Sequence, residues 1–405
     1  MNNSPLEFLA KKYGNIVKYD AAGNVAGIFV KFPKMKSSDL VAGLPNHTHP
    51  AFIINGVEQD YILIGKYKGG ENGVANGALV SLPNIMPARS LGADQCLSRM
   101  KMAGTGITGM TCADGGFIKL LAQKHGWVPK GNTYWGQSHK DATCWEVGKA
   151  LTANTERAYE GWLYKCLVNH TTAAELRPDI TPTHWEKGKF IGGISQDTGI
   201  DANHQTGYRT LNGSGPLDWY LGSDPANLAD IIGSSMEQQY GYRIYDCELQ
   251  ILADNNAADP DADLSASSAA WKAILPNAGD DGYTLVAPGT TGTLHWNWTG
   301  SAIQLDTQCD DLTIGAKGQA FKTLTAHSTR LPYVPSIVKE LGLFPTDAND
   351  NTEGSYYVNF VAGERFPRRG GYCSGASVTG LGFVDAYDER GASYTSFGCR
   401  PRSLP

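Results

Sequence analysis

The sequence predicts an α+β fold of short strands joined by many turns, with few helices. Two features of its composition indicate this: glycine supplies 48 of the 405 residues, and the chain contains 19 tyrosines and 9 tryptophans. Glycine allows the tight turns that join short strands, and aromatic side chains favour strands over helices. Hydrophobic residues make up 41% of the chain, which is enough to bury a sizeable core. We therefore expect short twisted antiparallel strands, two or three helices and long loops.

A few segments carry helix signals. Residues 4–7 (SPLE) place a capping serine before a proline at the first helical position, with a glutamate three residues after the cap. The short helix that begins there cannot bury itself alone, so we expect residues 1–26 to form a tether or docking segment. Residues 93–102 and 117–125 predict two further helices, each followed by a glycine that ends it.

Strand signals dominate the rest of the chain. Short apolar or aromatic runs predict strands at residues 27–31, 51–54, 61–64, 242–252, 284–286, 356–360 and 381–387. Residues 253–268 (ADNNAADPDADLSASS) are polar and are predicted to form a loop.

Charge and hydropathy exclude several classes of protein. The chain carries 34 Lys and Arg residues against 40 Asp and Glu, a net charge of −6. Nucleic acid is not expected as a partner, because phosphate binding needs clustered positive charge. No apolar run approaches the ~20 residues of a membrane helix, and the first residues (MNNSPLEFLAKKYG) show no secretory signal. If the protein acts outside a cell, we expect unconventional export or carriage on a particle.

The cysteines predict buried free thiols rather than a disulfide scaffold. They are Cys96, Cys112, Cys144, Cys166, Cys247, Cys309, Cys373 and Cys399, and no two stand at CxxC spacing. One or two bridges, for instance Cys373 with Cys399, stay open at this point.

Three apparent motifs do not predict a site. Residues 104–109 match GxGxxG, but no apolar strand precedes them and no amphipathic helix opens after them. Residues 259–263 resemble a calcium loop that lacks its turn glycine and its final glutamate. His47 and His49 have no third ligand nearby and are expected as surface or turn residues. With no nucleophile or metalloprotease motif either, we expect no catalytic residue, no cofactor and no metal.

A set of short phrases in fixed order carries more information than any single motif. The phrases are HPAFI (49–53), NGVE (55–58), IGKY (64–67), PKGN (129–132), YWGQS (134–138), TLNGSGPLDW (210–219), GYRIYDCELQI (241–251), RGG (369–371), GLGF (380–383), Arg390 and GCRP (398–401). This series resembles the phage and bacterial variable proteins that retroelements diversify. The resemblance implies a C-type-lectin-like domain over residues 27–405, related to the formylglycine-generating enzymes.

The C-terminal segment, residues 363–402, divides into a frame and interchangeable positions. Gly370 and Gly371 permit a sharp reversal, and Arg390 and Arg400 are suited to bidentate anchoring on a carboxylate or the backbone. The residues between are small, polar or tyrosine, a mixture typical of antibody paratopes. Ordinary turn composition is the alternative on residues alone.

The resemblance favours the first interpretation, because in these variable proteins the segment forms an exposed ligand-binding face whose codons are rewritten at adenines. Residues such as Tyr, Ser, Asp and Gly are reachable from an Asn codon in that way. The ligand-binding residues expected here are Tyr372, Ser374, Asp385, Tyr387, Asp388, Gly391, Ser393, Tyr394 and Ser396. Cys399 departs from the family, which usually has an aromatic residue there.

Two related activities lack their residues in this sequence. Formylglycine-generating enzymes carry two cysteines a short step after RGG, whereas here Cys373 follows too soon and the next cysteine is Cys399. Calcium-dependent lectins use Glu-Pro-Asn or Gln-Pro-Asp together with Trp-Asn-Asp, and residues 296–298 read Trp-Asn-Trp. Neither the oxidation nor calcium-mediated sugar binding is expected.

An insertion at residues 145–200 has no counterpart in these phrases. Residues 159–186 resemble a small chitin-binding type of carbohydrate-binding module, with its pattern YxC…HT…P…W. Trp162, Tyr164 and Trp185 are the candidates for stacking on sugar rings. The alternative is that these rings form the core of an insertion too small to fold without them.

These observations together predict a display protein and not an enzyme. We expect a phage receptor-binding or tail-tip protein, located on the virion, that recognises a bacterial surface protein or glycan. The N-terminal segment would attach it to the tail, and a homo-oligomer would raise avidity. The alternatives are a formylglycine-generating type of enzyme and a bacterial surface adhesin.

Overall fold

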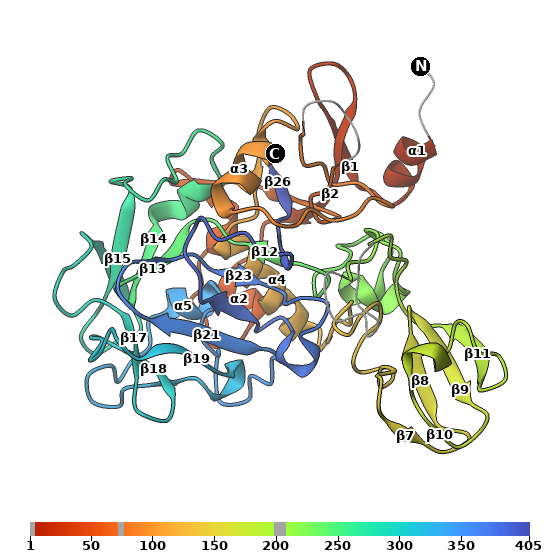
Figure 1. Ribbon diagram of the computed structural model, residues 1–405. Coiled ribbons are helices and arrows are strands. Elements are labelled where there is room, and N and C mark those ends of the chain that lie inside the picture. The colour runs from red at the N-terminus through yellow and green to blue at the C-terminus, as the bar shows by residue number, and fades with distance from the viewer. Residues whose placement is uncertain (1–4, 72–76, 198–207) are drawn as a thin grey trace.

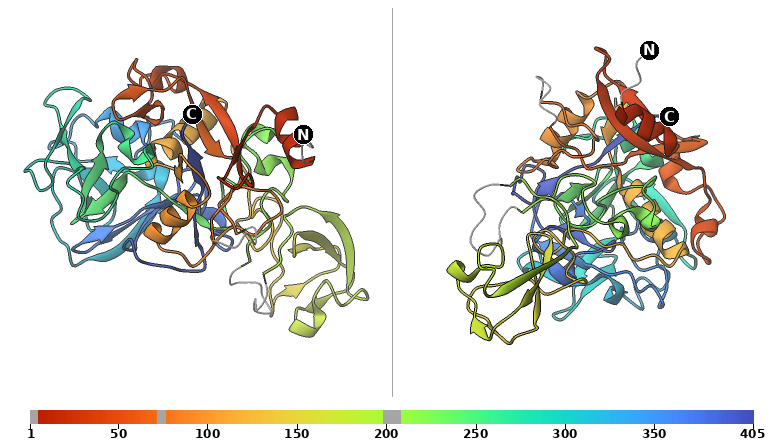
Figure 2. Two further views of the ribbon diagram at one scale, coloured as in Figure 1. Left: turned by 90° about the horizontal axis from the view of Figure 1, so that it is seen from above. Right: turned by 90° about the vertical axis from the view of Figure 1, so that its right-hand side faces the viewer.

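The computed structural model describes residues 5–71, 77–197 and 208–405 and confirms a mixed α+β architecture that is rich in sheets (Figure 1). A main body contains most of the chain, and the stretch predicted to be an insertion projects from it as a separate lobe, drawn in yellow to green (Figure 2). The α-helices of the described residues are α1 (Pro5–Lys12), α2 (Ser37–Leu40), α3 (Ala93–Lys101), α4 (Cys112–Lys124) and α5 (Ser336–Glu340). Short 3-10 turns lie at η1 (Pro50–Phe52), η2 (Ala174–Leu176), η3 (Leu217–Trp219), η4 (Leu221–Ser223), η5 (Ala253–Ala258), η6 (Phe321–Thr323) and η7 (Ala376–Val378).

The first sheet joins the two ends of the chain. Its strands, in spatial order, are β1 (Ile16–Tyr19), β2 (Val25–Pro33), β5 (Tyr61–Gly65), β26 (Pro401–Ser403) and β6 (Ile107–Gly109). The C-terminal strand β26 lies inside this sheet, where Arg402 is paired with Ile64 on one side and Thr108 on the other. Arg402 is buried and donates to the carboxylate of Asp114 at 2.9 Å, which ties the strand to α4.

The second sheet carries most of the C-terminal segment. Its strands, in spatial order, are β19 (Gly315–Ala320), β21 (Ser355–Phe360), β24 (Val384–Ala386), β23 (Arg368–Arg369), β12 (Met236–Gln238) and β25 (Phe397–Gly398). Side chains alternate across a strand, so one face of this sheet carries Tyr356, Val358 and Val384 into the main core. The other face is turned away from that core.

The third sheet also lines the main core. Its strands are β16 (Tyr283–Val286), β15 (Trp271–Pro276), β14 (Glu248–Leu252), β17 (His295–Trp298), β18 (Ile303–Asp306) and β20 (Thr325–Ala326); β13 (Tyr242–Tyr245) branches from β14, and β22 (Glu364–Arg365) pairs with β13. Trp296, Tyr356 and Phe117 are fully buried in the core between these layers and the helices. A small hairpin, β3 (Ile53–Ile54) with β4 (Val57–Glu58), lies outside it.

The lobe has a core of its own. Its strands are β7 (Ala150–Leu151), β8 (Glu156–Tyr159), β9 (Trp162–Cys166), β10 (His170–Thr171) and β11 (Trp185–Phe190). Six buried side chains form its interior: Trp145, Leu151, Tyr159, Tyr164, Cys166 and Trp185. They form a cluster distinct from the main core, which agrees with the lobe standing apart in Figure 1.

The predicted helices are present, with one shifted boundary. Helices α1 and α3 agree with the prediction within a residue, although the capping Ser4 lies outside the described residues. Helix α4 begins at Cys112 rather than at Phe117. The reason is a capping box: Thr111 Oγ1 accepts from the Asp114 amide at 3.2 Å, and an Asp114 carboxylate oxygen accepts from the Thr111 amide at 2.8 Å.

Several predicted strands are corrected. Residues 242–252 form the hairpin β13–β14 and not one strand, because Asp246 and Cys247 turn the chain with φ of 48° and 66°. Residues 51–54 begin as the 3-10 turn η1, and the strand predicted at 381–387 shrinks to β24. The polar segment 253–268 includes η5 and buries Ala257 and Ala258, so it is only partly a surface loop.

Candidate ligand-binding face

The outward face of the second sheet holds a row of paired polar and aromatic side chains. Tyr357 on β21 is paired with Asp385 on β24, and Asp385 is paired with Arg368 on β23. Directly paired residues lie on the same side of a sheet, so these three side chains share the face that is turned away from the main core. Beside them, Phe397 on β25 packs under the Arg368 guanidinium, 3.6 Å from the ring centre.

A small apolar cluster supports this face. Phe383 and Phe397 are buried in it together with Met236, and the partly exposed rings of Tyr357 and Tyr372 pack against them. Tyr372 meets Phe383 edge to face with ring centres 6.3 Å apart. The cluster thus fixes the backbone under the face while leaving tyrosine edges in solvent.

The frame positions of the C-terminal segment are tightly enclosed. Gly370 and Gly371 have φ of 85° and 78°, and a Cβ at these positions would lie 2.5 Å from the Ile231 carbonyl oxygen and 2.4 Å from a Thr379 methyl. Any side chain there would strain the backbone and collide with its neighbours. The RGG reversal therefore requires both glycines.

The predicted contact positions are open by comparison. Tyr387 and Tyr394 are 46% and 57% exposed, and Gly391 and Ser393 are exposed as well. A Cβ built on Gly391 would meet no atom within 4 Å, and its φ is not positive, so the position accepts a side chain without strain. Four further predicted residues are half-buried: Tyr372, Ser374, Asp388 and Ser396.

Asp385 corrects the predicted set, because its side chain is buried and not exposed. Only 8% of the residue is accessible, and its carboxylate lies 3.9 Å from the Arg368 guanidinium. Burial raises the pKa of Asp385 to about 6. One of its oxygens accepts from the Tyr387 amide at 3.1 Å, so Asp385 shapes the turn that leads to the exposed tyrosine.

Two arginines anchor the segment as predicted. Arg390 makes a bidentate pair with Glu364, with both N–O distances 3.0 Å, and also donates to Asp94 at 3.0 Å. Arg400 is fully buried and donates to Glu237 at 2.8 to 3.2 Å and to three backbone carbonyls. The loop that carries Tyr387 and Tyr394 is therefore fixed between the two tyrosines, at Arg390, and again after them, at Arg400.

The lobe offers less aromatic surface than predicted. Tyr164 and Trp185 are 4% and 3% exposed, so they cannot stack on a sugar, and they belong to the core that the alternative interpretation described. Trp162 is half-buried. The Lys187 ammonium lies 3.7 Å from its ring centre, and Phe190 meets it edge to face at 5.1 Å.

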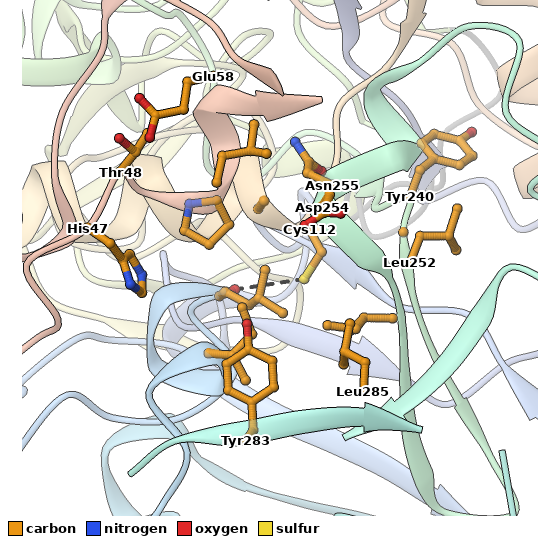
Figure 3. A pocket seen from close by; sticks show the side chains of 17 residues that line it. His47, Thr48, Glu58, Cys112, Tyr240, Leu252, Asp254, Asn255, Tyr283 and Leu285 are labelled. Carbon is orange, nitrogen blue, oxygen red and sulfur yellow. Dashed lines mark hydrogen bonds between the residues drawn. The ribbon is translucent and has the colours of Figure 1, made fainter. Parts of the chain in front are cut away.

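A cavity of about 350 Å³ lies away from this face, between the segment around His47 and the region of η5 (Figure 3). Its polar lining includes His47, Glu58 and Asp254, and its walls are mainly apolar. Cys112 also lines it, but burial raises the pKa of this thiol, so it does not supply a thiolate. Sequence reasoning missed the cavity because its residues come from segments far apart in the chain.

The two histidines near this cavity differ in their surroundings. His49 lies in a turn as expected, where it caps η1, but it is fully buried and not at the surface. Its Nδ1 accepts from the Ala51 amide at 3.1 Å, and its Nε2 lies 3.0 Å from the Glu340 carbonyl oxygen. Burial lowers the pKa of His49 to about 4. His47 is half exposed, and its hydrogen bond to the Glu340 carboxylate, 2.7 Å long, raises its pKa.

The structure contradicts the disulfide pairing that the sequence left open. Cys373 lies in a cluster with Trp135 and Cys144, whereas Cys399 lies in another cluster with Cys96, so the suggested Cys373–Cys399 bridge is wrong. Across the described residues no group of three or more His, Cys, Asp or Glu side chains could hold a metal ion. Within the same residues no helix is long and apolar enough to cross a membrane.

The comparisons with known proteins give no family for this chain. No protein-family model matches it, and no curated protein matches it at a significant level.

Proposed function

We propose that this chain is a ligand-binding display protein with a C-type-lectin-like fold, of the type that retroelements diversify. It would bind a bacterial surface protein or glycan through its outward C-terminal face, without covalent chemistry. Carriage on a phage tail, attached through the N-terminal segment, is the setting we favour. A bacterial surface adhesin of the same fold is the alternative setting.

One observation carries the proposal: enclosed and open positions alternate along the C-terminal segment. A side chain at Gly371 would collide with Thr379, whereas one at Gly391 would meet nothing within 4 Å. The exposed tyrosines Tyr387 and Tyr394 lie near that open position in the chain, between the anchored residues Asp385 and Arg400. A surface built in this way accepts exchanges of contact residues with little effect on the fold, as display of variable contacts requires.

The fold proposal has its own support. Both chain ends enter one sheet, and the sheets are short and curled with few helices around them. The phrases that carry the family resemblance also include tightly packed positions: Gly371 and Arg400 are buried, and so is Phe383. The resemblance therefore rests partly on residues with a structural task.

The enzymatic alternative has weaker support. Oxidation of a substrate cysteine in the related enzymes needs reactive thiols near the RGG phrase. Cys373 is buried, and burial raises its pKa to about 12, so it stays protonated at neutral pH. A turnover assay with a cysteine-containing sulfatase peptide tests this directly, and we expect no product.

Binding of the purified, fluorescently labelled full chain to intact bacterial cells tests the proposed face. The panel of strains should include the natural host of the gene and its close relatives, read by flow cytometry. We expect the double variant Tyr387→Ala/Tyr394→Ala to lose at least about tenfold in apparent affinity, because large exposed aromatic side chains carry much of a paratope's contact area. Gly391→Trp should also block binding, since a bulky side chain fits there without strain.

A matched control uses tyrosines of similar exposure elsewhere. Tyr19 and Tyr333 are 43% and 49% exposed, and the double variant Tyr19→Ala/Tyr333→Ala should bind as the parent does. All variants should keep the parent melting temperature within about 2 °C, because exposed substitutions change stability little. Equal binding by both double variants would refute the face. In the gene, a near-copy of the last coding segment that differs at adenines would establish the retroelement.

A further inference from the structure

The hairpin turn between β13 and β14 places a cysteine in an unfavourable backbone conformation. Asp246 and Cys247 are its two central residues, with φ of 48° and 66°. Two-residue turns of this kind prefer Asn and Gly, because a β-carbon is disfavoured in the left-handed region. A cysteine at Cys247 therefore points to a use for its side chain rather than for its backbone.

A second cysteine lies against this turn from another part of the third sheet. The Trp296 amide on β17 donates to the Cys247 carbonyl oxygen at 2.9 Å. Strand β17 pairs with β18, and Cys309 follows three residues after the end of β18. Cys309 packs against the main core that contains Cys247, and the amide of the adjacent Asp310 donates to Asn297 Oδ1, next to Trp296, at 3.1 Å. The two thiols therefore lie close enough to interact.

The two thiols have complementary surroundings. Cys247 is fully buried, and the neighbouring Cys309 thiol together with burial raises its pKa. Cys309 is only half-buried, so a small disulfide can reach its sulfur before that of Cys247. A reachable thiol beside a sheltered partner is the arrangement of a nucleophilic and a resolving cysteine.

We propose that Cys309 and Cys247 form a disulfide by exchange with a small-molecule disulfide such as oxidised glutathione. The Cys309 thiolate attacks one glutathione sulfur, which breaks the glutathione S–S bond and releases one glutathione thiolate. The Cys247 thiol then gives its proton to solvent, and its sulfur attacks Cys309 and displaces the second glutathione. Two protein thiols become one disulfide, and the glutathione disulfide takes up the two electrons. This inference does not depend on the proposed function.

A second thiol pair in the chain serves as an internal control. Cys96 and Cys399 lie in one buried cluster and also interact, but neither side chain is accessible to solvent. Exchange at this pair needs the structure to open, so it should stay reduced while the protein is folded.

The experiment incubates the folded full chain with oxidised glutathione at neutral pH, blocks the remaining thiols and maps the peptides by mass spectrometry. We expect a cross-linked peptide pair joining Cys247 and Cys309, with Cys96 and Cys399 still reduced. The new bond closes a long loop between two distant segments, so the melting temperature should rise by about 5 °C.

Two variants separate the steps. Cys247→Asn keeps a residue that tolerates the left-handed turn, so it should fold and carry one glutathione on Cys309 without a cross-link. Cys309→Ser should show neither product at Cys247. An unmodified Cys309 in both the parent and Cys247→Asn would overturn the proposal. A glutathione that stays on Cys309 in the parent, or prior oxidation of the Cys96–Cys399 pair, would overturn it as well.

Discussion

Replacing Glu237 with glutamine should destabilise the protein strongly, because this one carboxylate serves two buried cations. Arg400 donates to it through Nε at 3.1 Å and through Nη2 at 2.8 Å, and the Lys68 ammonium lies 2.6 Å away. All three side chains are buried, at 0 to 2% exposure. Glu237 also lies on β12, which pairs with β23 and β25 of the C-terminal segment.

The size of the effect follows from what the substitution leaves behind. Glu237→Gln keeps the shape of the side chain but leaves Arg400 and Lys68 buried without their shared counter-charge. Removing one partner of a buried ion pair costs about 3–5 kcal/mol. Although burial opposes ionisation of Glu237, the charges of Arg400 and Lys68 outweigh it and lower its pKa. The stabilisation is therefore present above the unfolded pKa of about 4.5 and is lost as the pH falls below it.

Urea unfolding at neutral pH measures this loss as a difference in the free energy of unfolding. Glu58→Gln is the matched control: Glu58 is exposed and pairs with Lys34 at 3.1 Å, so its loss should leave the free energy of unfolding nearly unchanged. A loss below about 1 kcal/mol for Glu237→Gln would refute the reasoning. It would mean that water or another group compensates the two cations.

Three further outcomes are expected. Burial lowers the pKa of His49 to about 4. About 3 kcal/mol of stability is therefore present above pH 6.5 and should be lost as the pH falls towards 4. His49→Gln should flatten this pH dependence in acid unfolding curves. The pKa of Asp385 is raised to about 6, so the pH dependence is the opposite. Stability should decline by up to about 3 kcal/mol as the pH rises from 4 through 6. Asp385→Asn should remove that decline in urea unfolding curves taken across this range. Trp185→Ala removes a large buried side chain from the lobe and should lower the local stability of the lobe by about 3–5 kcal/mol. Amide hydrogen exchange should therefore become faster in the lobe, while the amides of the main body stay protected.

Local signals in the sequence predict the elements that local chemistry determines. The ends of α3 and α4 follow from a glycine near each boundary, and proline at Pro5 suits the first described position of α1. The start of α4 was missed because the Thr111–Asp114 box uses aspartate where glutamate is usual. The hairpin at Cys247 was missed because its central residues are not the Asn-Gly pair that marks such turns.

Burial of single side chains in the C-terminal segment depends on distant parts of the chain. Asp385 has the composition of a contact residue, yet Arg368 draws it into the sheet from another strand. Tyr164 and Trp185 look the same in sequence whether they bind sugar or fill a small core, and only the surrounding strands of the lobe decide. The anchoring arginines were predictable, whereas their partners Glu237 and Glu364 were not, because they come from other strands.

The position of β26 between β5 and β6 has a consequence for synthesis on the ribosome. Ile64 and Thr108 are synthesised early, but the sheet can join their strands only after Arg402 has been synthesised. The N-terminal third of the molecule thus stays incomplete until translation has passed the segment that we propose to be rewritten. A reading-frame error or early stop introduced there leaves a product that lacks β26. Proteases can remove this incomplete product before assembly. Among genes with rewritten contact codons, only those translated to the end of the chain would then give a folded protein.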